Sequence, residues 1–315
     1  LPVKLDIENV SRCNFRCQMC QVSGWEKGRR AEDMSFNSFK ALIDEQYGVV
    51  ELKIQGMGEP ILGRSEYFKM IQYAREQRIW VRTVTNGSIL HKTNNYKKLI
   101  DSDVNELQIS VDGSTKEVFE KIRAKSNFEK VIDNCKLIND YGASVGKRRT
   151  KMWTVVQNDN IHQLDDLVKL GAELGFPSMV FSLDVGDWGQ EEWADKNVGF
   201  RLSDFDDDEG LRLINLGKKL GIDVYFWYLE SKYGVGEKSK LCPWPFERAY
   251  VSSDMRVVPC CMIANPDSYE LGDASGGFES VWFSDTYKQF RQAHVEGRIP
   301  DICKGCYKNS NEGSD

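Results

Sequence analysis

The feature that most limits the fold of this chain is a regular alternation of strand and helix patterns before residue 230. Short β-branched and aromatic stretches recur, each followed by a helical stretch of roughly 10–15 residues. The expected strands are residues 3–9, 49–55, 79–85, 106–111, 151–156, 179–183 and 223–228. This alternation predicts βαβ units with a parallel sheet. About six units precede residue 230, so we expect an α/β fold, a partial (β/α)6 barrel, with its active site at the carboxyl ends of the strands.

The pattern changes from Ser231 onward, where Gly, Pro, Trp and Cys become frequent and helical periodicity fades. We therefore expect two domains, with residues 1–230 forming the partial barrel and residues 231–315 forming a small C-terminal domain. A chain of 315 residues with 41% apolar residues can build both around a packed core.

The charge and hydropathy of the chain exclude two classes of partner. The net charge is −6, and phosphate contacts need clustered Lys and Arg, so no nucleic acid is expected. Apolar stretches such as Val224–Leu229 are too short to cross a bilayer, so no membrane is expected. No charged-then-apolar leader stands at the N-terminus.

The chain has nine cysteines, namely Cys13, Cys17, Cys20, Cys135, Cys242, Cys260, Cys261, Cys303 and Cys306. A disulfide framework suits small, loop-rich secreted chains, and this chain is neither small nor loop-rich. An odd count also leaves one thiol over. Metal ligation in a reducing compartment explains the cysteines better, so we expect a cytoplasmic protein.

The first cysteine group, Cys13, Cys17 and Cys20, has the spacing C-x3-C-x2-C directly after the first expected strand. Three thiolates on one loop can hold three irons of a [4Fe–4S] cube and leave the fourth iron open for another ligand. Zinc is the alternative, but it usually takes two C-x2-C pairs or Cys together with His.

The loop and the turns after the next strands resemble the radical SAM (S-adenosylmethionine) superfamily. The segment Gly56-Met57-Gly58-Glu59-Pro60 resembles its G-G-E-P motif, with Met in place of the second Gly. The resemblance implies that Gly58 and Glu59 receive the methionine ammonium of SAM and that Met19 packs near the adenine. Alone, the pentapeptide would be read as an ordinary turn.

Two later segments extend the resemblance. Thr85-Asn86-Gly87 resembles the polar turn after the third strand, which implies a SAM contact by Asn86. Residues 109–113 resemble the fourth-strand segment, which implies that Ser110 faces the ribose or methionyl group. Arg123 is expected at the SAM carboxylate, since a guanidinium matches a carboxylate in geometry. The alternative for Arg123 is a solvated charge on a helix.

The resemblance also implies the chemistry. A low-potential [4Fe–4S] cluster reduces SAM, and the resulting 5′-deoxyadenosyl radical abstracts hydrogen from an unactivated C–H bond. A flavodoxin- or ferredoxin-type reductant is the expected electron donor.

The second cysteine group is Cys242, Cys260, Cys303 and Cys306. Four thiolates complete a closed [4Fe–4S] site, although zinc could take the same ligands. The flanking residues resemble the SPASM/twitch extension of radical SAM enzymes. Seven cysteines are usual in a full SPASM domain, and Met255 replaces its usual Gly, so a single auxiliary cluster is expected. The arrangement resembles that of aminoglycoside and aminocyclitol epimerases and dehydrogenases.

Two cysteines remain. Cys135 stands in an amphipathic helical stretch, where a buried structural thiol is expected. Cys261 follows an expected cluster ligand, and we predict it as a catalytic hydrogen-atom donor that quenches a substrate radical. The alternatives for Cys261 are a replacement ligand or a packed thiol.

The acidic and Trp-containing segment 184–193 follows a strand and could line the barrel mouth. Stacking Trp and carboxylates would suit a polyol or an amino sugar, whereas the plainer interpretation is a solvated loop. Asp184, nearest the strand end, is the predicted catalytic contact or base.

These observations leave four functions open. The first is epimerisation of a small sugar-like or aminocyclitol substrate, with Cys261 as donor. The second is two-electron oxidation of an alcohol, with the auxiliary cluster as electron acceptor. The third is modification of a ribosomal peptide, which we rank lower because the first strand begins at residue 3 and no leader-binding domain precedes it. The fourth is a non-catalytic zinc or iron–sulfur protein, which the open three-cysteine loop disfavours.

Overall fold

The structure is a computed structural model that describes residues 1–26, 28, 30, 32–183, 185–202, 205–227, 233–235 and 240–308. Its main sheet consists of β1 (Lys4–Ile7), β3 (Glu51–Ile54), β4 (Trp80–Thr85), β5 (Glu106–Ser110), β7 (Thr150–Val155), β8 (Ser178–Ser182), β9 (Asp223–Trp227), β11 (Arg248–Val251), β12 (Arg256–Val258) and β13 (Gly272–Asp273). Two short pairs stand apart, β2 (Arg16–Cys17) with β6 (Arg123–Ala124) and β10 (Tyr233–Gly234) with β14 (Tyr307–Lys308).

The described α-helices are α1 (Phe36–Glu45), α2 (Arg64–Glu76), α3 (Asn95–Asp101), α4 (Lys116–Ile122), α5 (Phe128–Ser144), α6 (Leu164–Glu173), α7 (Glu191–Val198), α8 (Asp207–Leu220), α9 (Trp244–Glu247), α10 (Phe278–Trp282) and α11 (Asp285–Val295). Short 3-10 helices are η1 (Gln21–Gly24), η2 (Pro60–Gly63), η3 (Lys92–Asn94), η4 (Ile161–Gln163) and η6 (Asp301–Cys306).

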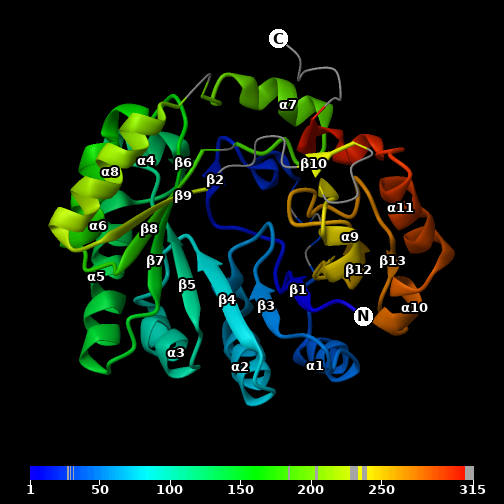
Figure 1. Cartoon of the computed structure of the whole chain (residues 1–315). Coiled ribbons are helices and arrows are strands. Elements are labelled where there is room, and N and C mark those ends of the chain that lie inside the picture. Colours follow the sequence, from blue (N-terminus) through cyan, green and yellow to red (C-terminus); the bar gives the residue numbers. More distant parts are fainter. Residues whose placement is uncertain are drawn as a thin grey trace, which may run out of the picture.

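The strand order is β13-β12-β11-β1-β3-β4-β5-β7-β8-β9, and every pair from β11 to β9 is parallel. The sheet curves into an open barrel with helices along its outer side (Figure 1). The predicted α/β partial barrel is therefore confirmed. The C-terminal part adds β11, β12 and β13 to the same sheet, beside β1. The predicted domain boundary at residue 230 lies outside the described residues and stays a prediction.

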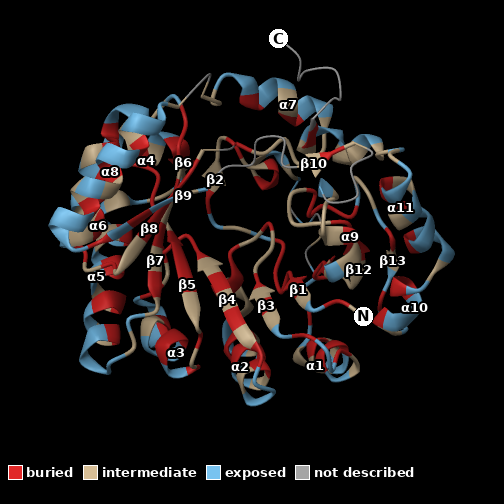
Figure 2. Cartoon of the chain, viewed as in Figure 1, coloured by how far each residue is buried: buried red, intermediate tan, exposed pale blue. Residues whose placement is uncertain are grey.

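The outer face of the sheet carries the core. Leu52 and Ile54 of β3 are fully buried, as are Phe39 of α1 and Tyr67 and Ile71 of α2. In Figure 2 the buried residues follow the strands and the sheet-facing sides of the helices. Alternation along each strand sends one side chain to this core and the next to the inner face. None of the described helices combines the length and apolarity that a membrane span requires.

Several helices begin at a side chain that accepts a hydrogen bond from the first turn. Ser35 caps α1, Thr115 caps α4, Asn127 caps α5 and Ser284 caps α11, each accepting from the backbone N–H three residues later. Such caps satisfy N–H groups that have no partner within the helix. They explain why these helices start where the sequence switches from a turn to helical periodicity.

The inner face of the sheet carries charged residues as well as aromatic ones such as Trp80 and Trp153. At the amino ends of five strands the charges alternate in sign and form a ladder of ion pairs. Its rungs are Lys4–Glu51 (2.9 Å), Glu51–Arg82 (3.6 Å), Arg82–Glu106 (3.1 Å) and Glu106–Lys151 (2.7 Å). This charged ladder joins β1, β3, β4, β5 and β7. It makes the amino end of the inner face polar, unlike the apolar faces usual in parallel sheets.

The ladder generates a stability prediction. Burial raises the pKa of Glu106, but the bond to Lys151 and the charge of Arg82 outweigh it, and the pKa falls below its usual value. Glu106→Gln should lower the free energy of unfolding by about 1–3 kcal/mol at neutral pH, since two cations lose their carboxylate. A carboxylate with a depressed folded pKa contributes stability that is lost as the pH falls through that pKa. The difference from wild type should therefore shrink below about pH 4.

Denaturant unfolding between pH 7 and pH 4 measures this effect. Asp285→Asn is the control, because that carboxylate is 90% exposed and pairs only with Lys288 at 3.6 Å. An equal loss in both variants, or a Glu106→Gln loss that does not change with pH, would contradict the role given to the ladder.

Candidate active site

The first cysteine loop directly follows β1 at the carboxyl edge of the sheet, and backbone bonds pin it. Within this loop β2 pairs antiparallel with β6, so Cys17 lies opposite Arg123. The Gln18 N–H donates to the Ile122 carbonyl at 3.1 Å, and the Cys20 N–H donates to the Cys17 carbonyl at 3.0 Å. The end of α4 therefore holds this loop against the barrel.

The three cysteines of this loop are half-buried and pack against apolar side chains. Burial raises the pKa of Cys13 and of Cys20 to about 12. It also raises the pKa of Cys17, despite the nearby Arg123 guanidinium. Such thiols stay protonated at neutral pH unless a bound metal replaces the proton. The donor set fits an iron–sulfur cluster held by three sulfurs from one loop.

Gly58 brings the Gly56–Pro60 segment against the start of the cysteine loop. A Cβ atom on Gly58 would lie 2.3 Å from the Val10 carbonyl oxygen, so only glycine fits at this position. The Glu59 N–H donates to the Arg12 carbonyl at 3.0 Å. The two segments predicted to share the SAM site therefore lie side by side.

Glu59 and Asn86 meet beside Cys13. The Glu59 carboxylate accepts from the Asn86 N–H at 2.7 Å and from the Thr85 hydroxyl at 2.6 Å. Burial nevertheless raises the pKa of Glu59 to about 7. The Asn86 amide donates to Asn14 Oδ1 at 3.0 Å and lies 3.8 Å from Cys13 Sγ. Both predicted SAM contacts thus border the cysteine loop, and their roles stay predictions.

Ser110 and Met19 lie further around the same edge. Ser110 ends β5, half-buried and opposite Trp153 in register. Met19 is buried beside Val185, and Trp188 Nε1 donates to the Met19 carbonyl at 3.3 Å. The segment that follows β8 therefore covers the cysteine loop, and the predicted adenine contact of Met19 stays a prediction.

Arg123 is buried and ion-paired. Its guanidinium lies 2.7 Å from Asp112 Oδ2, and the two side chains are 9% and 0% exposed. The Asp112 and Cys17 groups raise the pKa of Arg123 against the opposing effect of burial. A solvated helix charge is therefore the wrong interpretation of Arg123. Its predicted contact with the SAM carboxylate would have to form alongside the Asp112 pair.

The second cysteine group gathers residues from three places in the C-terminal part. Cys242 precedes α9, Cys260 follows β12, and Cys303 and Cys306 lie in η6. Burial raises the pKa of Cys260, with further contributions from Cys261 and Cys303. The Tyr307 hydroxyl accepts from the Cys242 N–H at 3.1 Å. Four half-buried sulfur donors are the ligand set of a closed iron–sulfur cluster.

A cavity of about 800 Å³ opens beside this second group, and all four of its cysteines line it. The opposite wall comes from the segment after β8, including Asp187, Glu191 and Arg201. The acidic segment thus lines a cavity, as one of its two interpretations expected. Asp184, the predicted base, lies outside the described residues.

Cys260 and Cys261 contact different surroundings although they are adjacent in sequence. Cys260 and Met262 line the cavity, whereas Cys261 packs against the cluster that contains Met57 and Tyr250. Burial raises the pKa of Cys261 to about 12, and Asp6 of β1 adds to the increase. Cys261 is therefore close to the inner face of the barrel.

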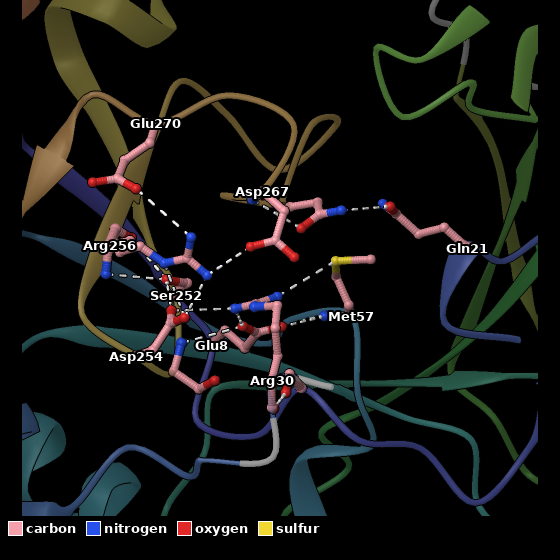
Figure 3. Close-up of polar contacts among 12 residues, drawn as sticks. Glu8, Gln21, Arg30, Met57, Ser252, Asp254, Arg256, Asp267 and Glu270 are labelled. Atoms are coloured by element: carbon pink, nitrogen blue, oxygen red, sulfur yellow. Dashed lines mark hydrogen bonds and ion pairs between the residues drawn. The ribbon is translucent and has the colours of Figure 1, made fainter. Parts of the chain in front are cut away.

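The carboxylate of Glu8 connects the two cysteine-bearing parts (Figure 3). Glu8 Oε1 accepts from the Met57 N–H at 3.0 Å, and Oε2 accepts from the Ser253 N–H at 3.1 Å. Arg30, from the segment after the cysteine loop, forms an ion pair with Glu8, and their side chains are 3% and 0% exposed. One buried carboxylate therefore binds three segments distant in sequence.

The network continues into the C-terminal part. Arg30 lies 3.5 Å from Asp254, and Asp254 pairs with Arg256 at 2.6 Å. Arg256 also pairs with Asp267 at 2.9 Å and lies 3.7 Å from Glu270 (Figure 3). These residues surround the hairpin that leads to Cys260.

The sequence analysis did not identify Glu8, Arg30 or Asp112. The sequence does contain a pattern that could have identified Asp112 and Glu8, because each is an acidic residue at the end of an expected strand. No such pattern marks Arg30, because its partner Glu8 lies 22 residues away and only the fold brings them together.

Comparison with known proteins identifies the family. The radical SAM superfamily matches residues 9–171, and the SPASM iron–sulfur cluster-binding domain matches residues 242–307. The first match covers more than half of the chain, so this protein belongs to the radical SAM superfamily. Its cofactors are accordingly a [4Fe–4S] cluster, SAM and an auxiliary iron–sulfur cluster in the SPASM part.

Three similar proteins share most of the chain. Mycofactocin maturase MftC of Mycolicibacterium smegmatis is 26% identical, over 96% of this chain and 77% of its own. Streptococcus suis SuiB bound to S-adenosylmethionine has a TM-score of 0.71 at 16% identity, over 92% of this chain and 68% of SuiB. BtrN in complex with AdoMet and 2-DOIA has a TM-score of 0.58 at 16% identity, over 98% of this chain and 94% of BtrN.

The cysteine sets make a prediction about iron content. Reconstituted wild-type protein should bind about eight irons per chain, because two cubanes carry four irons each. Cys17→Ala and Cys303→Ala should each retain about four, and Cys17→Ala should also lose SAM cleavage. Cys135→Ala, a fully buried thiol in α5, is the control and should keep all of the iron. Equal iron in all four proteins would contradict the assignment.

The Glu8–Arg30 pair makes a second prediction. Arg30→Gln leaves a buried carboxylate without its cation and should lower the free energy of unfolding by about 3–5 kcal/mol. Glu8→Gln added to Arg30→Gln should recover part of that loss, as a double-mutant cycle by denaturant unfolding would measure. Arg298→Gln is the control, because that side chain is 69% exposed. Additive losses would show that Glu8 and Arg30 do not interact.

Proposed function

We propose that this protein is a radical SAM enzyme that modifies a peptide. The observation that carries the proposal is the similarity to mycofactocin maturase MftC along almost the whole chain. The fold is also shared with SuiB, which has been crystallised with the precursor peptide SuiA. The cavity of about 800 Å³ is within the range that holds ligands of several residues.

This proposal revises the order of the hypotheses from the sequence. Epimerisation or oxidation of a small sugar-like substrate ranked first there, and peptide modification ranked third. The similarity to BtrN covers 98% of this chain but is 16% identical, so it supports a common fold alone. The peptide is accordingly the preferred substrate, in place of a small molecule.

The site residues take the following roles in this proposal. The first cluster would be held by Cys13, Cys17 and Cys20, and a single auxiliary cluster by Cys242, Cys260, Cys303 and Cys306. SAM would be held by Met19, Gly58, Glu59, Asn86, Ser110 and Arg123. The buried Asp112 neutralises Arg123, and the bonds from Thr85 and Asn86 orient the Glu59 carboxylate.

When bound, the first cluster and SAM supply a 5′-deoxyadenosyl radical that removes a hydrogen atom from the substrate. The protein confines this chemistry by burial, because Met57, Val258 and Tyr250 close an apolar wall around the cysteine loop. Cys261 packs on that wall with its thiol protonated. Its S–H bond would break as the hydrogen atom passes to the substrate radical. The thiyl radical left on Cys261 would take one electron, from the flavodoxin- or ferredoxin-type reductant, and one proton to restore the thiol.

The test is an anaerobic incubation of reconstituted enzyme with SAM, dithionite and peptides encoded by short reading frames beside its own gene. One such peptide should raise the yield of 5′-deoxyadenosine severalfold over SAM alone, and mass spectrometry should show a changed residue in it. Aminocyclitols and amino sugars are the parallel substrates. Turnover of a sugar, with every peptide unchanged, would overturn the proposal.

A Cys261→Ala variant in deuterated water tests the donor role within the same incubation. The Cys261 thiol exchanges its hydrogen with the solvent, so a donor Cys261 should place deuterium in the product of the wild-type enzyme. The Cys261→Ala variant should still cleave SAM but should not form that product. If Cys261→Ala forms the same product as the wild-type enzyme, Cys261 is not the hydrogen donor.

A further inference from the structure

The inner face of the barrel carries polar groups that the charged ladder does not use. The register places Asp6 of β1 directly opposite Tyr250 of β11 on one side and Lys53 of β3 on the other. Arg248 lies two residues before Tyr250 and opposite Lys4. These positions alternate with Leu5, Ala249 and other core residues, so they share the inner face.

Two of these residues carry a buried polar atom. Tyr250 is 1% exposed, and Arg248 is half-buried. The Tyr250 hydroxyl and Arg248 Nε are buried atoms with no hydrogen-bond partner among the described residues. A buried polar group without a partner costs stability, so such groups in a native protein point to a ligand.

Two cations of this face lie outside the charged ladder. Lys4, Arg82 and Lys151 pair with Glu51 and Glu106 within the ladder. Within the described ranges, Lys53 and Arg248 form no ion pair, although the whole chain carries a net charge of −6. Two cations on one face without an ion-paired carboxylate favour an anionic group beside them.

The position of this set relates it to the reaction. Tyr250 belongs to the apolar cluster that Cys13, Cys20 and Cys261 contact. Asp6 is opposite Tyr250 in register and Lys53 is opposite Asp6, so these groups extend from that cluster across the inner face. A ligand on these groups would therefore lie between the first cysteine loop and Cys261.

We propose that Lys53 and Arg248 bind a carboxylate of the substrate on the inner face of the barrel, with the Tyr250 hydroxyl donating to it. A guanidinium and an ammonium are both common partners of a carboxylate in proteins. Asp6 accepts from a neighbouring donor, such as the N–H of a peptide unit. The inference rests on the proposed function for the peptide origin of this carboxylate, which is either a chain end or an acidic side chain.

Small probes test the site without turnover. The reconstituted enzyme is titrated anaerobically with N-acetylglycine, which models a chain end, and with N-acetylaspartate α-amide, which models an acidic side chain. N-acetylglycinamide is the neutral control, and sodium chloride keeps the ionic strength constant. Thermal unfolding as a function of probe concentration gives each Kd, because a ligand of the native state raises Tm.

At least one carboxylate probe should raise Tm where the neutral probe does not. The probe that binds more tightly shows whether the site prefers a chain end or an acidic side chain. Lys53→Gln and Arg248→Gln should each raise the Kd of that probe roughly tenfold or more, and Tyr250→Phe should raise it by less. Lys136→Gln, an exposed lysine on α5, should leave the Kd unchanged. Iron content and the Tm without probe establish that each variant is folded.

The inference fails if neither carboxylate exceeds the neutral probe, or if both keep their wild-type Kd in Lys53→Gln and Arg248→Gln. If a carboxylate binds but no peptide is modified, the result contradicts only the proposed function. If a peptide is modified but neither carboxylate binds, the result contradicts only the proposed binding site.

Discussion

The buried Glu8 carboxylate is the contact on which the arrangement of both cysteine groups depends. It accepts from Met57 in the SAM-type turn and from Ser253 before Cys260, and Arg30 neutralises it. A buried charge is costly unless it is paired and fully hydrogen-bonded, and here each oxygen has a donor. Any shift of one segment would break a bond to the others. The relative position of the two loops is therefore set by electrostatics as well as by packing.

Charged residues on the inner face make this sheet unusual, because a parallel sheet normally buries apolar residues on both faces. Alternating charges at the amino ends, from Lys4 to Lys151, join neighbouring strands. Lys53 and Arg248 lie outside this ladder, on the two strands that flank β1. The ion pairs that stabilise the sheet and the cations proposed to bind the substrate therefore share one face.

The sequence predicted the parts of this protein that local pattern determines. Strand and helix periodicity gave the partial barrel, and C-x3-C-x2-C gave the family. The sequence analysis did not identify Arg30 or Tyr250, because their roles depend on partners that only the fold brings near. Arg123 was left between two interpretations, since burial beside Asp112 cannot be read from a helix end. The comparisons support a peptide substrate better than the sugar-like substrate ranked first, and nothing local in the sequence distinguishes the two.

Cys260 and Cys261 are adjacent in sequence but face two different parts of the molecule, the auxiliary cysteine group and the inner face of the barrel. One thiol lines the cavity of the auxiliary group, and the next packs toward Asp6 and the inner face. Consecutive Cα atoms are about 3.8 Å apart, so with Cys260 as a cluster ligand and Cys261 as hydrogen donor, the two proposed roles, the backbone itself would limit the distance between cluster and substrate. The Glu8 network supports the hairpin that ends in this pair. A weakened Glu8 contact would therefore disturb the substrate side and the cluster side together.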